Sequence, residues 1–583
     1  MAKVDTPMMN PKQQYEARLQ HWRKVLESED KHYKQISDIR LWVVIAGLVT
    51  AWWAALPWIA VPIVAFVALV VWHVKVDARR IDAKRGIAYS ERGLKRLEGK
   101  WAGTGTSGDR FKDSNHVYAD DLDVFGRGSL FELLCTARTG PGEDVLAQWL
   151  LHPADADSVR ERQQAVKELA SQVDLRETAA LAGEDIRANW RLKHTPAFPS
   201  YAQPLSMAVS LAAIVSATGF TMGWWDSSPF LATALVALGV LYLFREQIIL
   251  GLDALETSTR ELDLLVRLLH HLEERTFTTP LLKRLRETVT GSSKEVAYLK
   301  RLMTFGDTGR NAYLLPLTIP SLWNVHVAYA MWRWQERHRQ QVDAWMNALA
   351  EFEALSSLAC HGFENPDHAT PQLIEKPEFV ATALGHPLLA AAHCITNDVE
   401  VGVLGARTII VSGSNMSGKS TLLRSIGLNT ILAWTGATVR AAQLQVGPLA
   451  VGASLRTADS IQDGKSRFYA EITRLKQITD LTIGGKQVLF LLDELLSGTN
   501  SHDRRIGAEG ILKALLERGA IGLVTTHDLA LASIADIDEM IRNVHFEDHV
   551  ENGEIRFDYK MRQGVVTRSN ALELMRAVGL LKS

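Results

Sequence analysis

The chain has 583 residues and a formal net charge of −2 at pH 7. This length allows several domains, and the near-neutral charge excludes a protein that attracts nucleic acid through an overall positive field. The three cysteines, Cys135, Cys360 and Cys394, have neither disulfide-framework nor metal-site spacing, which excludes a cysteine-rich scaffold and agrees with a reducing compartment.

Residues 1–40 are polar and rich in Lys, Arg, Glu and Gln. Tyr15, Leu19, Trp22 and Leu26 recur at helical spacing, which predicts an amphipathic helix on the cytoplasmic side. A charged segment of this length is too long for the first region of a signal peptide, so we expect no cleaved leader before the apolar run that follows.

An almost wholly apolar run without charge extends from Leu41 to Trp72. It is too long for one simple span, and Leu56-Pro57 interrupts it, so the sequence predicts two helices of about 16 residues, near the minimum that crosses a bilayer. We assign residues 41–73 to a transmembrane hairpin, with a buried hairpin of a soluble domain as the alternative. Basic residues on both flanks place both of its ends in the cytoplasm: Lys31, Lys34, Arg40, Lys75, Arg79 and Arg80.

Residues 74–200 are expected to combine a basic juxtamembrane segment with soluble helices. The stretch from Arg79 to Lys100 could bind DNA phosphates, but a charge cluster that fixes the membrane topology is the favoured interpretation. Farther along, apolar residues in Asp120–Val173 follow helical patterns.

A second pair of apolar runs, Leu205–Gly223 and Phe230–Phe244, encloses a turn with a single charge, Asp226. Basic residues stand on both sides of the pair, so residues 204–245 are assigned to a second transmembrane hairpin with both ends cytoplasmic. The expected number of spans is four, and an even number keeps both termini in the cytoplasm.

Residues 246–360 are expected to form long helices. Leucines recur at helical spacing in Leu250–Leu285 and in Gln335–Leu358, with charges between them. Tyr313–Trp334 is apolar but contains Pro316 and Pro320, so we interpret it as a core or membrane-surface helix rather than a fifth span.

The pattern G-x-x-x-x-G-K-[ST] occurs at residues 413–420. An apolar run, Thr408–Val411, predicts a strand before it, and Leu422–Leu432 predicts a helix after it, which is the context that a phosphate-binding loop requires. Backbone N–H groups of such a loop surround a β-phosphate at the positive end of the helix, the lysine reaches the β- and γ-phosphates, and the hydroxyl after it binds Mg²⁺. The sequence therefore predicts a site for ATP and Mg²⁺ formed by Gly413, Ser414, Asn415, Met416, Ser417, Gly418, Lys419, Ser420 and Thr421.

Two later strands are expected to supply the catalytic groups. Gln487–Leu492 is an apolar run that ends at Asp493 and Glu494. In such an ATPase the first carboxylate holds Mg²⁺ and the second polarises the attacking water. A further strand, Gly522–Thr526, carries His527 at its tip to sense the γ-phosphate, and the polar turn between the two strands, residues 497–503, is of the kind that faces a partner subunit.

Together these segments resemble the MutS family of mismatch-repair ATPases. The loop is similar to the family sequence G-P-N-M-G-G-K-S-T, with Ser414 and Ser417 in place of the usual Pro and Gly. The run D-G-K-S-R-F at 463–468 with Glu471 resembles S-G-R-S-T-F-x-x-E. The Leu-Asp-Glu at 492–494 with Ser-Gly-Thr at 497–499 resembles D-E-x-x-x-G-T, although Arg504 stands where a Gly is common. Thr-His at 526–527 resembles the family's T-H pair.

The resemblance also extends outside the nucleotide site. The segment from 130 to 162 partly matches the pattern of the MutS core domain, and G-H-P-L at 385–388 resembles the R-H-P motif that opens the family's ATPase domain. The resemblance implies an α/β P-loop domain of the ABC and MutS type at residues 361–583. An all-α core and lever region, interrupted by the two transmembrane hairpins, would precede it.

The resemblance implies a Mg²⁺-dependent ATPase that forms a homodimer, in which Ser466 reaches the nucleotide of the other subunit. It further implies contact with double-stranded or branched DNA, while the hairpins imply a multi-pass protein of the inner membrane with a cytoplasmic ATPase domain. The family's mismatch-binding domain is replaced here by residues 1–73, so no discrimination between matched and mismatched DNA is expected. The alternative is a membrane ATPase that drives signalling or remodelling without DNA; a transporter of the ABC type is disfavoured because no L-S-G-G-Q signature occurs.

Overall fold

The structure is a computed structural model of the chain. Two compact units are present: one comprises Met1–Thr136, Val145–Val173 and Ala354–Ser583, and the other Ala137–Asp144 and Asp174–Glu353. The structure describes residues 10–53, 56–183, 196–252, 259–309, 311–403, 405–414, 416–455, 467–496, 501–527, 532–536, 539–551 and 554–566.

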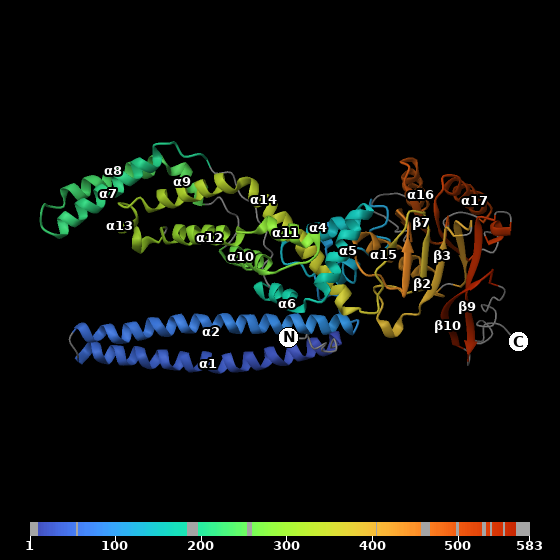
Figure 1. Cartoon of the computed structure of the whole chain (residues 1–583), viewed down its shortest axis with the longest axis horizontal. Coiled ribbons are helices and arrows are strands. Elements are labelled where there is room, and N and C mark those ends of the chain that lie inside the picture. Colours follow the sequence, from blue (N-terminus) through green and yellow to red (C-terminus); the bar gives the residue numbers. More distant parts are fainter. Residues whose placement is uncertain are drawn as a thin grey trace. The chain divides into compact units, whose positions relative to one another are not determined.

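The first unit begins with two long helices, α1 (Pro11–Trp53) and α2 (Leu56–Leu97), which lie side by side as a hairpin (Figure 1). Their close approach depends on Gly93, because a Cβ atom there would overlap the Tyr15 ring. The expected boundaries at residues 40 and 73 lie inside these helices, and the two predicted helices of about 16 residues are instead 43 and 42 residues long. No helix-breaking residue separates the polar from the apolar part of either helix, so each continues through both.

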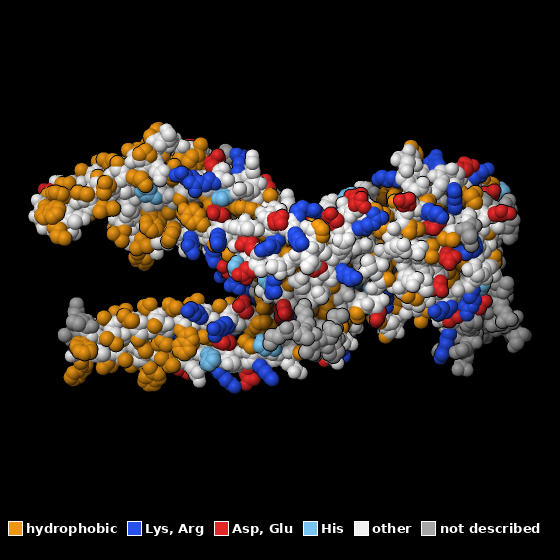
Figure 2. Space-filling view, viewed as in Figure 1, with side chains coloured by type: hydrophobic (Ala, Val, Ile, Leu, Met, Phe, Trp, Pro, Cys, Tyr) orange, Lys and Arg blue, Asp and Glu red, His pale blue; other side chains and the backbone are white. Residues whose placement is uncertain are grey.

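Three helices of the described residues are long and apolar enough to cross a membrane: Pro11–Trp53, Ala60–Leu97 and Ala202–Thr221. A fourth span results if Ser228–Leu243 and Arg245–Leu252, which meet at an angle of 66°, are counted as one. Figure 2 shows hydrophobic side chains over the connected ends of α1 and α2 and over the second hairpin, whose helices are α7 (Ala202–Thr221) and α8 (Ser228–Leu243). Trp52 and Trp53, at the end of α1, are 85% and 84% exposed.

The second unit is helical throughout its described residues. The predicted helix over Gln335–Leu358 lies within α14, a single helix of 42 residues that continues into the first unit. The described residues of Leu250–Leu285 are helical except for a break before Pro280, where a new helix begins because a proline ring fits only the first turn. The helices are α6 (Val173–Ala182), α7, α8, α9 (Arg245–Leu252), α10 (Thr259–Glu274), α11 (Pro280–Val289), α12 (Ser292–Gly309), η2 (Ala312–Leu314), α13 (Leu315–Thr318) and α14 (Trp323–Glu364).

A buried carboxylate joins two segments of the second unit. Glu353 of α14 accepts a hydrogen bond of 2.8 Å from the backbone N–H of Arg138 and another from the Thr139 hydroxyl. Burial raises the pKa of the Glu353 carboxyl to about 7, although both hydrogen bonds act in the opposite direction. The folded chain therefore holds a proton at Glu353 in a pH range where the unfolded chain has released it.

The expected consequence is a pH-dependent loss of stability that Glu353→Gln removes. Because the pKa is near 4.5 in the unfolded chain and about 7 in the folded chain, the stabilising contribution is complete below pH 4.5. It falls by about 3 kcal/mol at most as the pH rises through 7. Thermal denaturation of both proteins from pH 4.5 to 8 should show the variant gaining stability relative to wild type as the pH rises. The exposed Glu336→Gln is the control, and a constant difference across this range would contradict the assignment.

The C-terminal part of the first unit contains a sheet of six strands in the order β10-β9-β4-β8-β7-β6 (Figure 1). Strands β9, β4, β8, β7 and β6 are mutually parallel, and β10 is antiparallel at one edge. A smaller sheet has the order β1-β5-β2-β3. The strands are β1 (Gln372–Leu373), β2 (Phe379–Leu384), β3 (Asn397–Val401), β4 (Thr408–Ser412), β5 (Gln443–Val446), β6 (Leu449–Ser454), β7 (Gln487–Leu492), β8 (Ile521–Thr526), β9 (Ile541–Glu551) and β10 (Glu554–Gln563).

Helices cover both faces of the six-stranded sheet. Phe490 and Leu492 of β7 belong to a core that includes Leu475 of α16 and Leu512 of α17. Side chains alternate along a strand, so Leu491 points to the other face, where it contacts α15 at Gly427. The remaining helices of this unit are η1 (Asp109–Phe111), α3 (Leu130–Leu134), α4 (Gly140–Leu151), α5 (Ala156–Ala170), η3 (Ala391–His393), α15 (Lys419–Thr435), α16 (Arg467–Ile483), α17 (Ser501–Glu517) and η4 (Ser533–Asp536).

Candidate active site

The carboxyl ends of three neighbouring strands meet at one edge of the sheet. Ser412 at the end of β4 is paired with Thr526 at the end of β8, and Leu492 at the end of β7 is paired with Val524. The loop after β4, the two carboxylates after β7 and His527 after β8 therefore leave the sheet at the same edge. Parallel α/β sheets bind their ligands at this edge.

The described residues of the loop after β4 include three with positive φ angles, just before the helix that follows. Gly418 has φ 104° and precedes α15, which begins at Lys419. The N-terminus of α15 presents free N–H groups and the positive end of the helix dipole. Gly413 has φ 149°, and Met416 has φ 72° with its side chain 85% exposed.

Lys419 is buried beneath the loop. Its Nζ atom donates hydrogen bonds of 2.8 Å and 2.7 Å to the backbone oxygens of Gly413 and Ser414. Burial lowers the pKa of the Lys419 ammonium, and the charges of Glu494 and Asp493 partly offset this effect. The positive charge of Lys419 is therefore held between the loop and the two carboxylates. The negative phosphates of a nucleotide bound at this place would be attracted to it.

Two hydroxyl groups of the loop are left without a hydrogen-bond partner among the described residues. They are the buried Oγ atoms of Ser414 and Ser417. Ser420 is half-buried in the first turn of α15, and Thr421 follows it on the exposed side. The structure thus brings all the described residues of the predicted loop together around the start of α15.

The two carboxylates after β7 are positioned by a threonine on the neighbouring strand. The Thr525 hydroxyl donates a hydrogen bond to Asp493 Oδ1 and accepts one of 2.9 Å from the Glu494 N–H. Glu494 Oε1 lies 3.7 Å from Nδ1 of His527. The sequence predicted both strands, but the bridging role of Thr525 depends on a pairing and a register that the sequence does not reveal.

The turn after the carboxylates has an unusual backbone. Glu494 and Leu496 have φ values of 48° and 57°, a region that non-glycine residues rarely occupy. Buried Glu471 of α16 accepts a hydrogen bond of 2.6 Å from the Leu496 N–H. Glu471, which the sequence motif singled out without a role, therefore fixes the turn that aims Glu494.

A pocket of about 620 Å³ adjoins the loop. The β9–β10 hairpin forms one wall, with Phe557 and Tyr559 in contact at 5.9 Å between ring centroids. Tyr559 has φ 55° at an irregularity of β10, and its backbone oxygen accepts a hydrogen bond of 3.0 Å from the Asn397 side chain. The other lining residues come from the loop helix and from the segment after β2: Leu384, His386, Leu389, His393, Cys394, Ile395, Asn397, Gly418, Thr421, Leu422, Ser425, Phe546 and Asp558.

Sequence reasoning missed this pocket because its walls come from segments more than 100 residues apart. Tyr559 lies far from every motif, and its ring approaches Gly418 so closely that a Cβ atom there would be 3.1 Å from it. The only signal was the run of aromatic residues in the last strand. Asn415, Ser466 and residues 497–500 lie outside the described residues.

The oxygen donors suit Mg²⁺. Ser420 and Asp493 offer a hydroxyl and a carboxylate, and Mg²⁺ is usually held by one or two protein oxygens together with waters and phosphate oxygens. Among the described residues no group of three or more His, Cys, Asp and Glu side chains could hold a metal by itself.

A parallel sheet with a glycine loop after one strand, a buried lysine and paired carboxylates after a neighbouring strand defines a P-loop nucleoside triphosphatase. Residues 409–583 match the family model described as MutS domain V. This part of the chain is therefore the P-loop ATPase domain of the MutS type, and the match supports membership of the MutS family.

Proposed function

We propose that the chain is a membrane-anchored MutS-type ATPase that binds ATP with Mg²⁺ at the loop of residues 413–421. The observation that carries this proposal is the meeting of Lys419, Asp493 and Glu494 at one edge of the sheet. The triphosphate would replace the loop oxygens as the partner of Lys419. The nucleoside would occupy the adjoining pocket, with its base beside Tyr559.

Mg²⁺ would be held by Ser420 and Asp493 and would neutralise the charge on the phosphates. Glu494 is the proposed group that orients the attacking water, because the Thr525 bridge and the bond from Leu496 to Glu471 hold its backbone in a fixed position. His527 lies beside Glu494 and would contact the γ-phosphate region. Ser466 would complete the site of the other subunit in a homodimer.

Membrane anchoring through the two hairpins rests on their exposed apolar surfaces. Water does not tolerate large contiguous apolar patches, whereas hydrocarbon does. The proposed topology has both termini and the ATPase domain in the cytoplasm and four spans in the inner membrane. Apolar residues with more than half of their surface exposed include Leu41, Trp42, Leu48, Trp58, Val64, Met207, Leu211, Leu231 and Leu235.

The first candidate function is that of an ATPase that binds DNA, which the resemblance to the MutS family suggests. One observation favours the second candidate, a remodelling or signalling ATPase that does not bind DNA. The basic stretch 79–100 is largely paired with carboxylates: Arg79 with Glu29, Arg80 with Asp30 and Asp77, Arg85 with Asp82, Arg96 with Glu364, and Lys100 with Glu98. These pairs compete with phosphate contacts from the same side chains.

A salt titration of DNA binding by the detergent-solubilised protein separates the two candidates. A protein that binds DNA phosphates loses affinity steeply as salt rises, and its affinity should respond to ATP. Absence of binding to duplex, mismatched and branched DNA at low salt would exclude the first candidate. Competition between a duplex with one G·T mispair and its matched control should show less than about tenfold preference, about 1.4 kcal/mol, because no mismatch reader is expected.

A further inference from the structure

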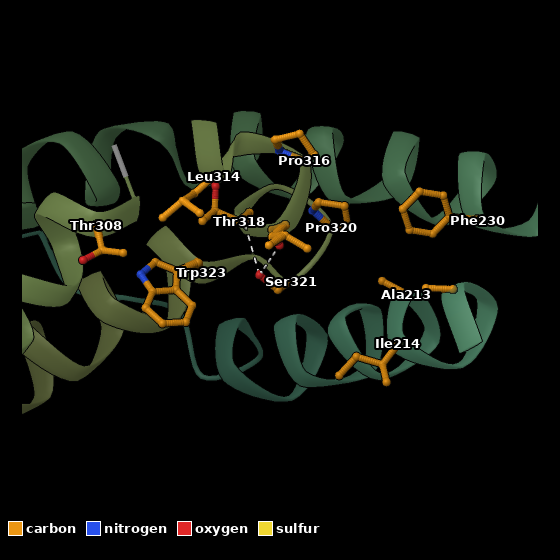
Figure 3. Close-up of a pocket in the computed structure, with 12 residues that line it drawn as sticks. Ala213, Ile214, Phe230, Thr308, Leu314, Pro316, Thr318, Pro320, Ser321 and Trp323 are labelled. Carbon is orange, nitrogen blue, oxygen red and sulfur yellow. Dashed lines mark hydrogen bonds between the residues drawn. The ribbon is translucent and has the colours of Figure 1, made fainter. Parts of the chain in front are cut away.

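A second cavity, of about 460 Å³, lies inside the helical unit, between the second hairpin and the segment that leads into α14 (Figure 3). Ala213, Ile214 and Phe230 come from α7 and α8, whereas Leu314 and Trp323 come from the segment opposite. Its other lining residues are Ala217, Thr308, Pro316, Leu317, Thr318, Pro320 and Ser321.

Two prolines account for the cavity. Pro316 and Pro320 interrupt the chain between α12 and α14, so that α13 is limited to Leu315–Thr318. Proline lacks the N–H group that a regular helix needs and its ring collides with the preceding turn. A continuous helix, which could pack flush against α7 and α8, is therefore prevented, and space is left between them.

The chemistry of the lining suits a hydrocarbon. None of the 12 lining residues carries a charge. Most of their polar groups are used internally: the Trp323 indole donates to the Phe305 oxygen at 2.8 Å, and the Ser321 hydroxyl donates to the Leu317 oxygen at 2.7 Å. The Thr318 hydroxyl is buried and has no hydrogen-bond partner among the described residues. An ionic or strongly polar ligand would lose its hydration in this cavity and could gain little more than one hydrogen bond, from the Thr318 hydroxyl.

The cavity is continuous with the surface proposed to face the bilayer. Ile214 and Leu317 line the cavity and are nevertheless 59% and 71% exposed. Exposed Leu211 and Val215 flank Ile214 on the same helix, which is one of the candidate spans. An occupant can therefore enter from the surrounding hydrocarbon without crossing a polar surface.

We propose that this cavity binds one acyl chain of a membrane phospholipid. The proposal rests on the membrane anchoring proposed above, and it adds a defined lipid site to a hairpin that would otherwise be only an anchor. The cavity falls within the usual size range of ligand pockets, about 300–1,000 Å³. Acyl chains are the apolar molecules that a bilayer supplies at high concentration to such an opening.

The test compares two substitutions on the same helix. Ala217 lines the cavity, so Ala217→Trp fills it, whereas Ala212 is exposed and does not line it. Each protein is purified in detergent, and bound phospholipid is counted by native mass spectrometry. Wild type and Ala212→Trp should retain about one phospholipid per chain, and Ala217→Trp should retain at least about fivefold less, since a bulky ring removes the available volume.

A second experiment locates the bound acyl chain by photocrosslinking, with a phospholipid that carries a photoreactive group at the end of one acyl chain. Crosslinks to the peptide that contains residues 314–323 should decrease in Ala217→Trp and persist in Ala212→Trp. The smaller substitution Ala217→Leu should give a partial decrease, so the test does not depend on the folding of the tryptophan variant. Equal retention by all the proteins, which would mean lipid around the outside of the hairpin only, overturns the site. Extraction of the wild type by carbonate would instead overturn the membrane anchoring itself.

Discussion

Replacing Glu494 by Gln is expected to reduce ATP turnover by about 10²–10⁴-fold while leaving ATP affinity within about twofold of wild type. Gln has the size of Glu but lacks the negative charge that polarises the attacking water. Lys419 and the loop, which bind the phosphates, are not altered. The expected variant is therefore one that binds nucleotide and fails to hydrolyse it.

Single-turnover phosphate release and equilibrium binding of a fluorescent ATP analogue measure the two quantities separately. Glu509→Gln, on the exposed side of α17, makes the same chemical change away from the site and should behave as wild type. Lys419→Ala should give the converse result: the variant should bind ATP so weakly that no hydrolysis is observed. Unchanged turnover in Glu494→Gln would show that another group orients the water.

Replacing Arg96 by Met is expected to lower the free energy of unfolding by about 3–5 kcal/mol. Arg96 Nε and Nη2 donate to both carboxylate oxygens of Glu364 at 2.6–3.0 Å, and the Tyr15 hydroxyl donates to the same carboxylate at 2.8 Å. Glu364 is buried. Removing the Arg96 guanidinium leaves the negative charge of Glu364 in apolar surroundings without a compensating positive charge.

Thermal denaturation of the detergent-solubilised protein measures this loss. The double variant Arg96→Met/Glu364→Leu should recover much of the stability, because replacing a buried pair by apolar side chains is often neutral. Lys95→Met, at the neighbouring exposed position, is the control and should change little. If the single and double variants were equally unstable, packing rather than the unpaired charge would explain the effect.

The sequence predicted the strands and the loop of the nucleotide site because those elements depend on local patterns. Thr408–Val411 and Gln487–Leu492 are short apolar runs followed by glycine or carboxylate, and both are strands in the structure. The role of Thr525 and the aromatic pocket at Tyr559 were not predictable, because both arise from strand pairing between distant segments. The helix α1 shows the opposite error: a change of composition at residue 40 was interpreted as a boundary, although the backbone continues through it.

The cluster at Glu364 also indicates how the first apolar hairpin can be removed from the chain. A fragment that starts after α2 would lose both Tyr15 and Arg96 and strand the Glu364 carboxylate, so such a fragment should also carry Glu364→Leu. Removing only the apolar tip and joining the two helices near the buried residues Ile36 and Val76 keeps both partners of Glu364. The second design removes the first apolar hairpin surface and keeps the buried contacts of Glu364 with Tyr15 and Arg96.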